Sequence, residues 1–86
     1  MRANKEKVTQ MLKIARGQLE AVINMVEEDR YCIDVSNQIL AIISILRNAN
    51  KEILNAHLSG CVKEALGEEA QEKVEEIMQI IDKLAK

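Results

Sequence analysis

The sequence predicts an all-α protein of three helices, in which the first two form a long antiparallel hairpin. The 86 residues contain no Pro and three widely spaced Gly, so little interrupts a helix along most of the chain. Apolar residues recur at spacings of three and four, which places them on one side of a helix. A chain of this length forms one small domain, and we expect a single helical domain over residues 1–86.

The first helix is predicted from about residue 4 to residue 28. Its apolar residues have the spacing of an amphipathic helix. They are Val8, Met11, Leu12, Ala15, Leu19, Val22, Ile23 and Val26. The polar run E-E-D-R-Y at 27–31 indicates a short connection, and either Asp29 or Asp34 is suited to cap the helix that follows.

The second helix is predicted to begin near Cys32, and no Gly or Pro follows before Ser59. Gly67 ends or interrupts this region, and a shorter third helix follows over about 68–84. The apolar residues of the third helix are Val74, Ile77, Met78, Ile81 and Leu84. Acidic residues occupy its first turns and a Lys lies near its end, as the helix dipole favours.

The segment 39–46, I-L-A-I-I-S-I-L, is apolar on nearly every side of a helix. Its composition is also compatible with a strand, but the periodicity of both flanking regions favours a helix. Two neighbouring helices in so small a chain cannot cover such a segment fully. We therefore expect this segment to be buried against a second copy of the chain, at a dimer interface.

The composition favours a small aliphatic core, since the chain has no Phe, no Trp and one Tyr. Small single cores are marginally stable, which favours oligomerisation. No apolar run reaches the roughly 18–20 residues of a membrane span and no signal-peptide pattern opens the chain, so we expect a cytoplasmic protein with reduced thiols and no membrane partner. The net charge is −2, yet residues 1–16 carry five basic residues and one acid, which is either ordinary surface patterning or a surface for a polyanion.

Cys32, His57 and Cys61 are the most informative residues of the chain. His57 and Cys61 are four residues apart, so a helix brings both to one side, where they can bind one ion. If residues 33–61 form a single helix, Cys32 lies roughly 37 Å from His57 at 1.5 Å per residue. Either the helix breaks, or the third ligand belongs to another subunit.

The chemistry of these three residues favours copper. Two thiolates and one imidazole are soft donors, which select Cu(I) or Zn(II) over Mg(II) and Ca(II). Zinc seeks a fourth ligand, whereas three donors suit Cu(I). Free cysteines are also frequent in protein cores, so residue types alone leave an incidental role open. The midpoint between residues 32 and 59 falls at 45–46, inside the apolar segment, so a symmetry axis there would bring Cys32 to the 57–61 turn of a second chain.

Two stretches of the chain resemble the copper-sensitive operon repressor family. They are L-K-I-A-R-G-Q-L-E-A-V-I-N-M-V-E-E-D-R-Y-C-I-D-V-S-N-Q-I-L-A at 12–41 and H-L-S-G-C-V at 57–62. The resemblance implies an all-helical repressor that assembles as a dimer of dimers on operator double-stranded DNA. It also implies that Cys32, His57 and Cys61 bind Cu(I) across the dimer, which releases the DNA. The nickel, persulfide and formaldehyde branches of the family differ at His57 or Cys61, so this set favours copper.

The resemblance also implies residues around the metal and on the DNA. Tyr31 and an acid of the third helix are the implied outer-shell partners, and Glu76, or else Glu75, is the acid that would fix the imidazole by a hydrogen bond. No helix-turn-helix or zinc-finger signature is present, so DNA contacts are implied by the resemblance alone. The candidates for operator contact are Arg16, Lys13, Arg47 and Lys51, with Lys5 and Lys7 as additional phosphate contacts. Arg47 lies one position before Asn48, where the family pattern places an Arg.

Two other functions fit the same residues. A thiol or persulfide sensor of the same fold would use Cys32 and Cys61 and would still respond after His57→Ala. A helical interaction module with incidental thiols would ignore both metals and oxidants. An enzyme is not expected, because the sequence offers no nucleophile with its base and orienting group, and no phosphate-binding loop.

Overall fold

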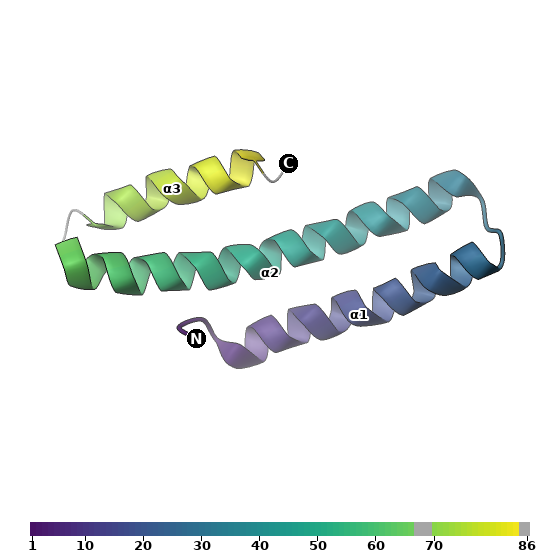
Figure 1. The fold of residues 1–86 in the computed structure, drawn as a ribbon, viewed down its shortest axis with the longest axis horizontal. Coiled ribbons are helices and arrows are strands. Elements are labelled where there is room, and N and C mark those ends of the chain that lie inside the picture. Colours follow the sequence, from purple (N-terminus) through teal and green to yellow (C-terminus); the bar gives the residue numbers. More distant parts are fainter. Residues whose placement is uncertain (67–69, 85–86) are drawn as a thin grey trace.

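Three α-helices lie side by side in the computed structural model (Figure 1). α1 spans Lys5–Glu27, α2 spans Cys32–Leu66 and α3 spans Ala70–Leu84. The prediction of an all-α chain with a long antiparallel hairpin is confirmed, and the first helix ends within one residue of each predicted bound. None of the helices in the described part of the chain is long and apolar enough to cross a membrane.

The description covers most of the chain. It includes the backbone of residues 1–66 and 70–84, and the side chains of residues 1–60, 72 and 74–83. Gly67, where the sequence predicts the end of the second helix, lies outside the described residues, as do the side chains of Cys61 and Leu84.

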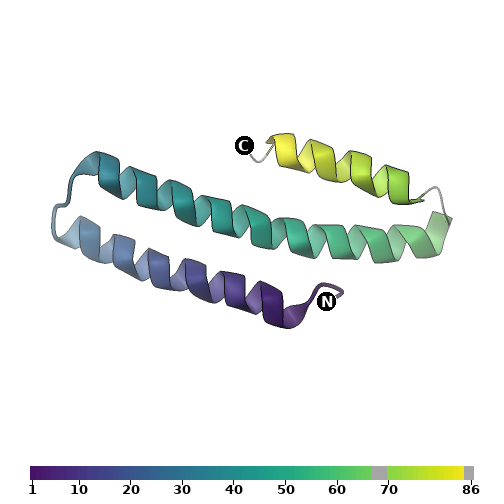
Figure 2. The same ribbon diagram turned by 180° about the vertical axis from the view of Figure 1, so that it is seen from behind.

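The helices form a single layer with α2 in the middle (Figures 1 and 2). Their Cα atoms extend over 54 × 26 × 10 Å. The smallest extent is about one helix deep, because a second stacked layer would add 8–10 Å between helix axes. α2 contacts α1 along one edge and α3 along the other, while α1 and α3 do not contact each other within the described residues. Both broad faces of α2 are therefore uncovered by this chain.

One narrow seam holds α1 against α2. Every seventh residue of α1 is buried, and the residues between them at spacings of three and four are half-buried. These residues are Val8, Met11, Ala15, Gln18, Val22 and Met25. The buried Ala15 and Val22 pack with Ile42 of α2, and Val35 and Ile45 lie against this cluster. The pattern is that of an antiparallel coiled coil.

The rest of the apolar stripe predicted for the first helix does not enter this seam. Leu12, Leu19, Ile23 and Val26 are 45, 50, 49 and 57% exposed. They occupy the flank of α1 beside the seam, since each lies one or four residues from a seam position. The predicted stripe therefore consists of two surfaces. The seam packs against α2, and the flank of α1 stays exposed in one chain.

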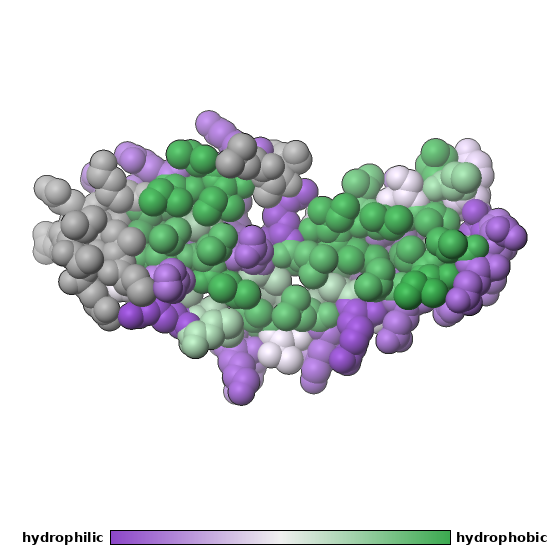
Figure 3. Space-filling model, in the orientation of Figure 1, coloured by the Kyte–Doolittle hydropathy of each residue, from purple (hydrophilic) through white to green (hydrophobic). Residues whose placement is uncertain are grey.

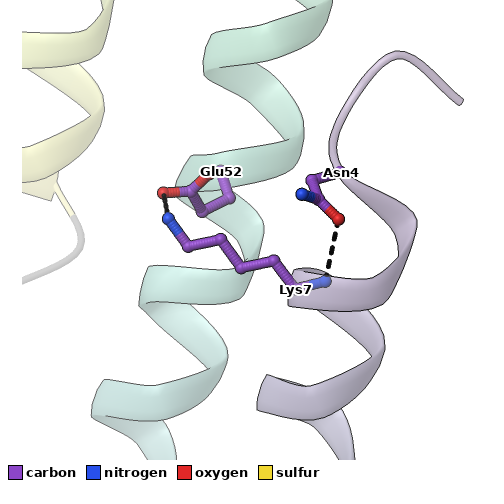
Figure 4. Close-up of polar contacts among 3 residues, drawn as sticks. All are labelled: Asn4, Lys7 and Glu52. Atoms are coloured by element: carbon purple, nitrogen blue, oxygen red, sulfur yellow. Dashed lines mark hydrogen bonds and ion pairs between the residues drawn. The ribbon is translucent and has the colours of Figure 1, made fainter.

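Hydrogen bonds define both ends of α1: a side chain accepts at its start, and backbone groups pair at its end. At its start the Asn4 side chain accepts a hydrogen bond of 3.0 Å from the Lys7 backbone N–H (Figure 4). At its end Asp29 has φ 54°, the Asp29 N–H donates to Val26 at 3.1 Å, and the Arg30 N–H donates to Met25 at 3.0 Å. This is a Schellman motif with Asp29 in the left-handed position.

The expectation that Asp29 or Asp34 caps the second helix is therefore wrong. Asp29 terminates α1, and Asp34 lies inside the first turn of α2, where its charge still suits the helix dipole. The residue before α2 is Tyr31, whose backbone carbonyl accepts a hydrogen bond of 3.1 Å from the Val35 N–H.

Replacement of Asp29 tests the Schellman motif. Asp29→Gly removes the Cβ that disfavours the left-handed conformation, so we expect a free energy of unfolding equal to or up to about 1 kcal/mol above that of the native chain. Asp29→Val places a β-branched side chain there, which should destabilise the protein by about 1–2 kcal/mol. Urea denaturation followed by circular dichroism measures both, and equal stability of the Val and Gly variants would contradict the motif.

α3 packs on the second half of α2 through Val74 and Met78, which are 1 and 7% exposed. Ile77 and Ile80, on the flank of α3, are 40 and 57% exposed. The predicted apolar stripe of the third helix is thus only partly buried in one chain.

Candidate functional site

α2 is one unbroken helix of 35 residues from Cys32 to Leu66. Its geometry separates Cys32 from His57 by roughly 37 Å at 1.5 Å per residue. Of the two arrangements that the sequence left open, the broken helix is therefore excluded, and one chain cannot bring these two side chains to one ion. Within the described residues, no three His, Cys, Asp or Glu side chains come close enough together to hold a metal. Cys61, whose side chain lies outside the described residues, is one turn after His57 in the same helix.

Cys32 has a free, exposed thiol at the start of α2. It borders an open pocket of about 430 Å³ where the α1–α2 hairpin turns. The apolar walls of this pocket are Val26, Val35, Ile39 and Leu40. A thiol at the rim of an open apolar pocket is accessible to a second molecule that covers the pocket.

One side of α2 carries both halves of the predicted site. We name the residues of this side the ligand face: Cys32, Ile39, Ile43, Leu46, Asn50 and His57. Successive members are seven, four, three, four and seven residues apart, which keeps them on one line along a helix. All six are exposed, and Ile39, Ile43 and Leu46 are 43, 44 and 45% exposed. Position 61 continues the line, four residues after His57.

The two uncovered faces of α2 differ in chemistry. The side opposite the ligand face carries the exposed polar residues Asp34, Asn37, Ser44, Asn48 and Asn55. Figure 3 shows that apolar residues gather on one broad face of the layer, over α1 and α2 in one area and over α2 and α3 in another. Within the 39–46 segment Ile42 is buried against α1, whereas Ile39, Ile43 and Leu46 are exposed, so its own chain does not cover the segment fully.

The predicted outer-shell residues are Tyr31, which precedes α2, and Glu76 of α3. Tyr31 precedes Cys32 and is 68% exposed. The ion pair between Lys51 and Asp82 fixes the antiparallel alignment of α2 and α3, and the same alignment places Glu76 level with His57 along the axis. Glu76 and Glu75 are both exposed, and Glu76 lies two residues from the buried Val74 and Met78, hence toward the outer side of α3. The hydrogen bond from the imidazole to Glu76 stays a prediction.

The candidate DNA-contacting residues lie in the middle of the molecule. Arg16 and Lys13 are exposed on α1, and Arg47 is half-buried on α2. The ion pair of 2.8 Å between Lys7 Nζ and Glu52 Oε1 aligns α1 with α2, and this alignment places Arg16 level with Ile43 (Figure 4). Lys51 is not isolated, because its Nζ lies 3.0 Å from Asp82 Oδ2. Lys5 is exposed, and with Lys13 it borders a surface pocket on α1.

Sequence reasoning missed the Lys7–Glu52 ion pair and two further contacts near these residues. The first is the Lys51–Asp82 pair, which no short-range spacing rule could reveal because the residues belong to different helices. The second is the contact of Arg2 with Gly60: a Cβ at position 60 would lie 2.9 Å from the Arg2 Cδ and closer still to the guanidinium. Gly60, in the run H-L-S-G-C, was the available signal, since Gly inside a helix often permits a close approach.

Comparison with known proteins supports the resemblance. The family model described as metal-sensitive transcriptional repressor matches residues 4–83. The copper-sensing transcriptional repressor RicR of Mycobacterium tuberculosis (strain ATCC 25618 / H37Rv) is 42% identical over 64 residues, which are 74% of this chain and 67% of that protein. The copper-sensing transcriptional repressor CsoR of Bacillus subtilis (strain 168) is 32% identical over 83 residues, which are 95% of this chain and 82% of that protein.

A third relative gives the same result. The copper-sensing transcriptional repressor CsoR of Mycobacterium tuberculosis (strain ATCC 25618 / H37Rv) is 38% identical over 80 residues, which are 92% of this chain and 67% of that protein. No solved structure gives a significant match. The family model and the relatives describe repressors rather than enzymes. A chain matched by the family model along nearly its whole length belongs to the metal-sensitive transcriptional repressors.

Proposed function

We propose that this protein is a Cu(I)-sensing transcriptional repressor that binds operator double-stranded DNA without metal and is released from it by Cu(I). The relatives named as copper-sensing repressors align with most of the chain, including the segment that contains the three candidate ligands. The structural support is the ligand face of α2, whose two ends carry complementary halves of one donor set.

The pairing of positions on the ligand face carries the proposal. A two-fold axis that crosses α2 between Ser44 and Ile45 would set two antiparallel copies of the helix side by side. It would then pair Ile43 with Leu46, Ile39 with Asn50, and Cys32 with His57. All the paired residues belong to the ligand face. One two-fold dimer would therefore bury its apolar residues and bring the candidate ligands together at each end. Two metal sites per dimer follow, each shared by both subunits.

The donor set of each shared site fits Cu(I). His57 and Cys61 of one subunit and the partner's Cys32 would supply two sulfurs and one nitrogen. Such soft ligands hold Cu(I) at low coordination number, whereas a zinc site of this kind would need a fourth ligand. The apolar pocket beside Cys32 would be closed by the partner, which keeps water from the thiolates.

Assembly would cover the apolar surfaces that so flat a chain leaves exposed. A single layer of helices leaves the ligand face and the apolar flank of α1 in water, and a second copy would cover both. Two such dimers would form the homotetramer that is expected for the family. Each basic residue of α1 and α2 is then presented four times, which favours salt-dependent binding to the phosphates of operator DNA in the cytoplasm.

The shared site would oppose DNA binding through linkage. When the start of one α2 is joined to the end of its partner, the angle between the two hairpins is fixed, and with it the spacing of Arg16 and its copies. If that spacing does not match the DNA, metal and DNA weaken each other's binding reciprocally, with a coupling of about 1–3 kcal/mol.

An anaerobic Cu(I) titration of DNA-bound protein tests the proposal. The DNA is a fluorescent duplex selected from a random pool by the metal-free protein, and anisotropy reports binding. We expect Cu(I) to lower the affinity by about five- to 150-fold. Copper that binds without changing the affinity for DNA would refute the switch.

The His57→Ala variant separates the copper sensor from the thiol sensor. It should bind the selected duplex normally and should no longer release it with Cu(I), because one of three donors is lost. A persulfide sensor that uses Cys32 and Cys61 would keep its response to polysulfide in this variant. The placement of His57 on the same face as Cys32 favours the metal.

A further inference from the structure

The Lys51–Asp82 ion pair joins the middle of α2 to the last turns of α3. Its Nζ and Oδ2 atoms are 3.0 Å apart, and the two side chains are 47 and 39% exposed. Lys51 also lines a groove of about 350 Å³ with Lys7, Asn48 and Asn55, on the side of α2 opposite the ligand face. The groove therefore contains lysines and amides that suit a phosphate. Glu52, which also lines the groove, pairs with Lys7, and Asp82 of α3 pairs with Lys51.

The carboxylate of Asp82 and a phosphate oxygen are alternative partners for the same ammonium. An exposed ion pair of this kind is weak, so the high charge density of DNA can displace it. Each Lys51–phosphate contact still contributes less binding free energy than it would without Asp82. The reason is that the Lys51–Asp82 ion pair is lost when the phosphate contact forms. The acid thus opposes DNA binding without touching the DNA.

We propose that Asp82 is a built-in competitor for DNA phosphate at Lys51, so that the end of α3 sets the affinity for DNA. The proposal rests on the proposed function, because it requires that this surface binds DNA. In the part of the chain that the structure describes, α3 contacts α2 and not α1, so the distance between Asp82 and Lys51 depends on how α3 sits on α2. A shift of α3 would change the affinity for DNA while the basic residues of α1 stay in place.

Asp82→Asn is the direct test. We use a labelled duplex of mixed sequence in about 0.15 M salt, where charges more than about 8 Å apart are largely screened. The substitution should raise the affinity about two- to fivefold, because Lys51 no longer exchanges one anion for another. Glu72→Gln is the matched control: it removes the same charge from an exposed position in the first turn of α3 and should change the affinity less than Asp82→Asn.

The Lys51→Met background identifies the partner of Asp82. Lys51→Met alone should weaken binding and lower the salt slope by about 0.9 if one phosphate contact is lost. Asp82→Asn added to Lys51→Met should then raise the affinity no more than Glu72→Gln does. The proposal is overturned if Asp82→Asn raises the affinity for DNA equally with and without Lys51. It is also overturned if Asp82→Asn and Glu72→Gln raise the affinity equally. Failure of the native chain to bind any duplex would instead refute the proposed function.

Discussion

Mixing Cys32→Ala protein with His57→Ala protein should create Cu(I) sites that neither variant forms alone. In a mixed dimer, Cys32 of the His57→Ala chain would meet the intact His57 and Cys61 of the other chain. The second site of the same dimer lacks both a thiol and the imidazole. Random exchange of subunits makes about half of the dimers mixed, so about a quarter of the native number of sites should return. Anaerobic Cu(I) titration with a chromophoric chelator as competitor measures this number.

A second mixture provides the matched control. His57→Ala and Cys61→Ala remove two donors that belong to the same half of the site, so every dimer of these two chains has two incomplete sites. No Cu(I) sites should return on mixing, although the two chains are mixed and exchange subunits in the same way as in the first mixture. Equal recovery in both mixtures, or recovery in neither, would contradict a site that shares Cys32 of one chain with His57 of its partner.

Much of the fold could be predicted because it depends on local rules. Apolar spacing, the absence of Pro and the polar run before Cys32 determine where helices form and where the hairpin turns. The candidate ligands could be proposed because thiols and imidazoles are rare in this chain and two of them are one helical turn apart. The unbroken α2 then follows from the same local rules, and with it the separation of Cys32 from His57.

The rest depends on which surfaces meet, and local rules do not determine that. Leu12 and Ala15 belong to the same apolar stripe, yet Ala15 is buried in the seam and Leu12 is 45% exposed. Only the position of α2 separates them. The pairing of Lys51 with Asp82 likewise depends on how α3 folds back on α2. Asp29 was predicted as a cap for the wrong helix, because an Asp at a hairpin serves equally as an N-cap or as a left-handed residue.

Ile43→Glu should dissociate the proposed dimer. The proposed axis lies between Ser44 and Ile45, so the two copies of Ile43 would lie close to it, each against the partner's Leu46. A Glu there would place two like charges in an apolar contact, and a buried carboxylate without a partner costs several kcal/mol. In one chain Ile43 is 44% exposed, so the substitution should leave the helices intact. Sedimentation velocity and far-ultraviolet circular dichroism measure the mass and the helix content.

Ile14→Glu is the control, because it makes the same substitution at an isoleucine outside the proposed interface. Ile14 is also an isoleucine and is 45% exposed, but it lies on α1 away from the flank of Leu12 and Leu19. The Ile14 variant should keep the native mass, whereas the Ile43 variant should sediment as a smaller species. Because each proposed metal site needs two chains, dissociation should also abolish tight Cu(I) binding. A monomeric Ile43→Glu protein that binds Cu(I) as tightly as the native one would show that the ligands do not come from two subunits.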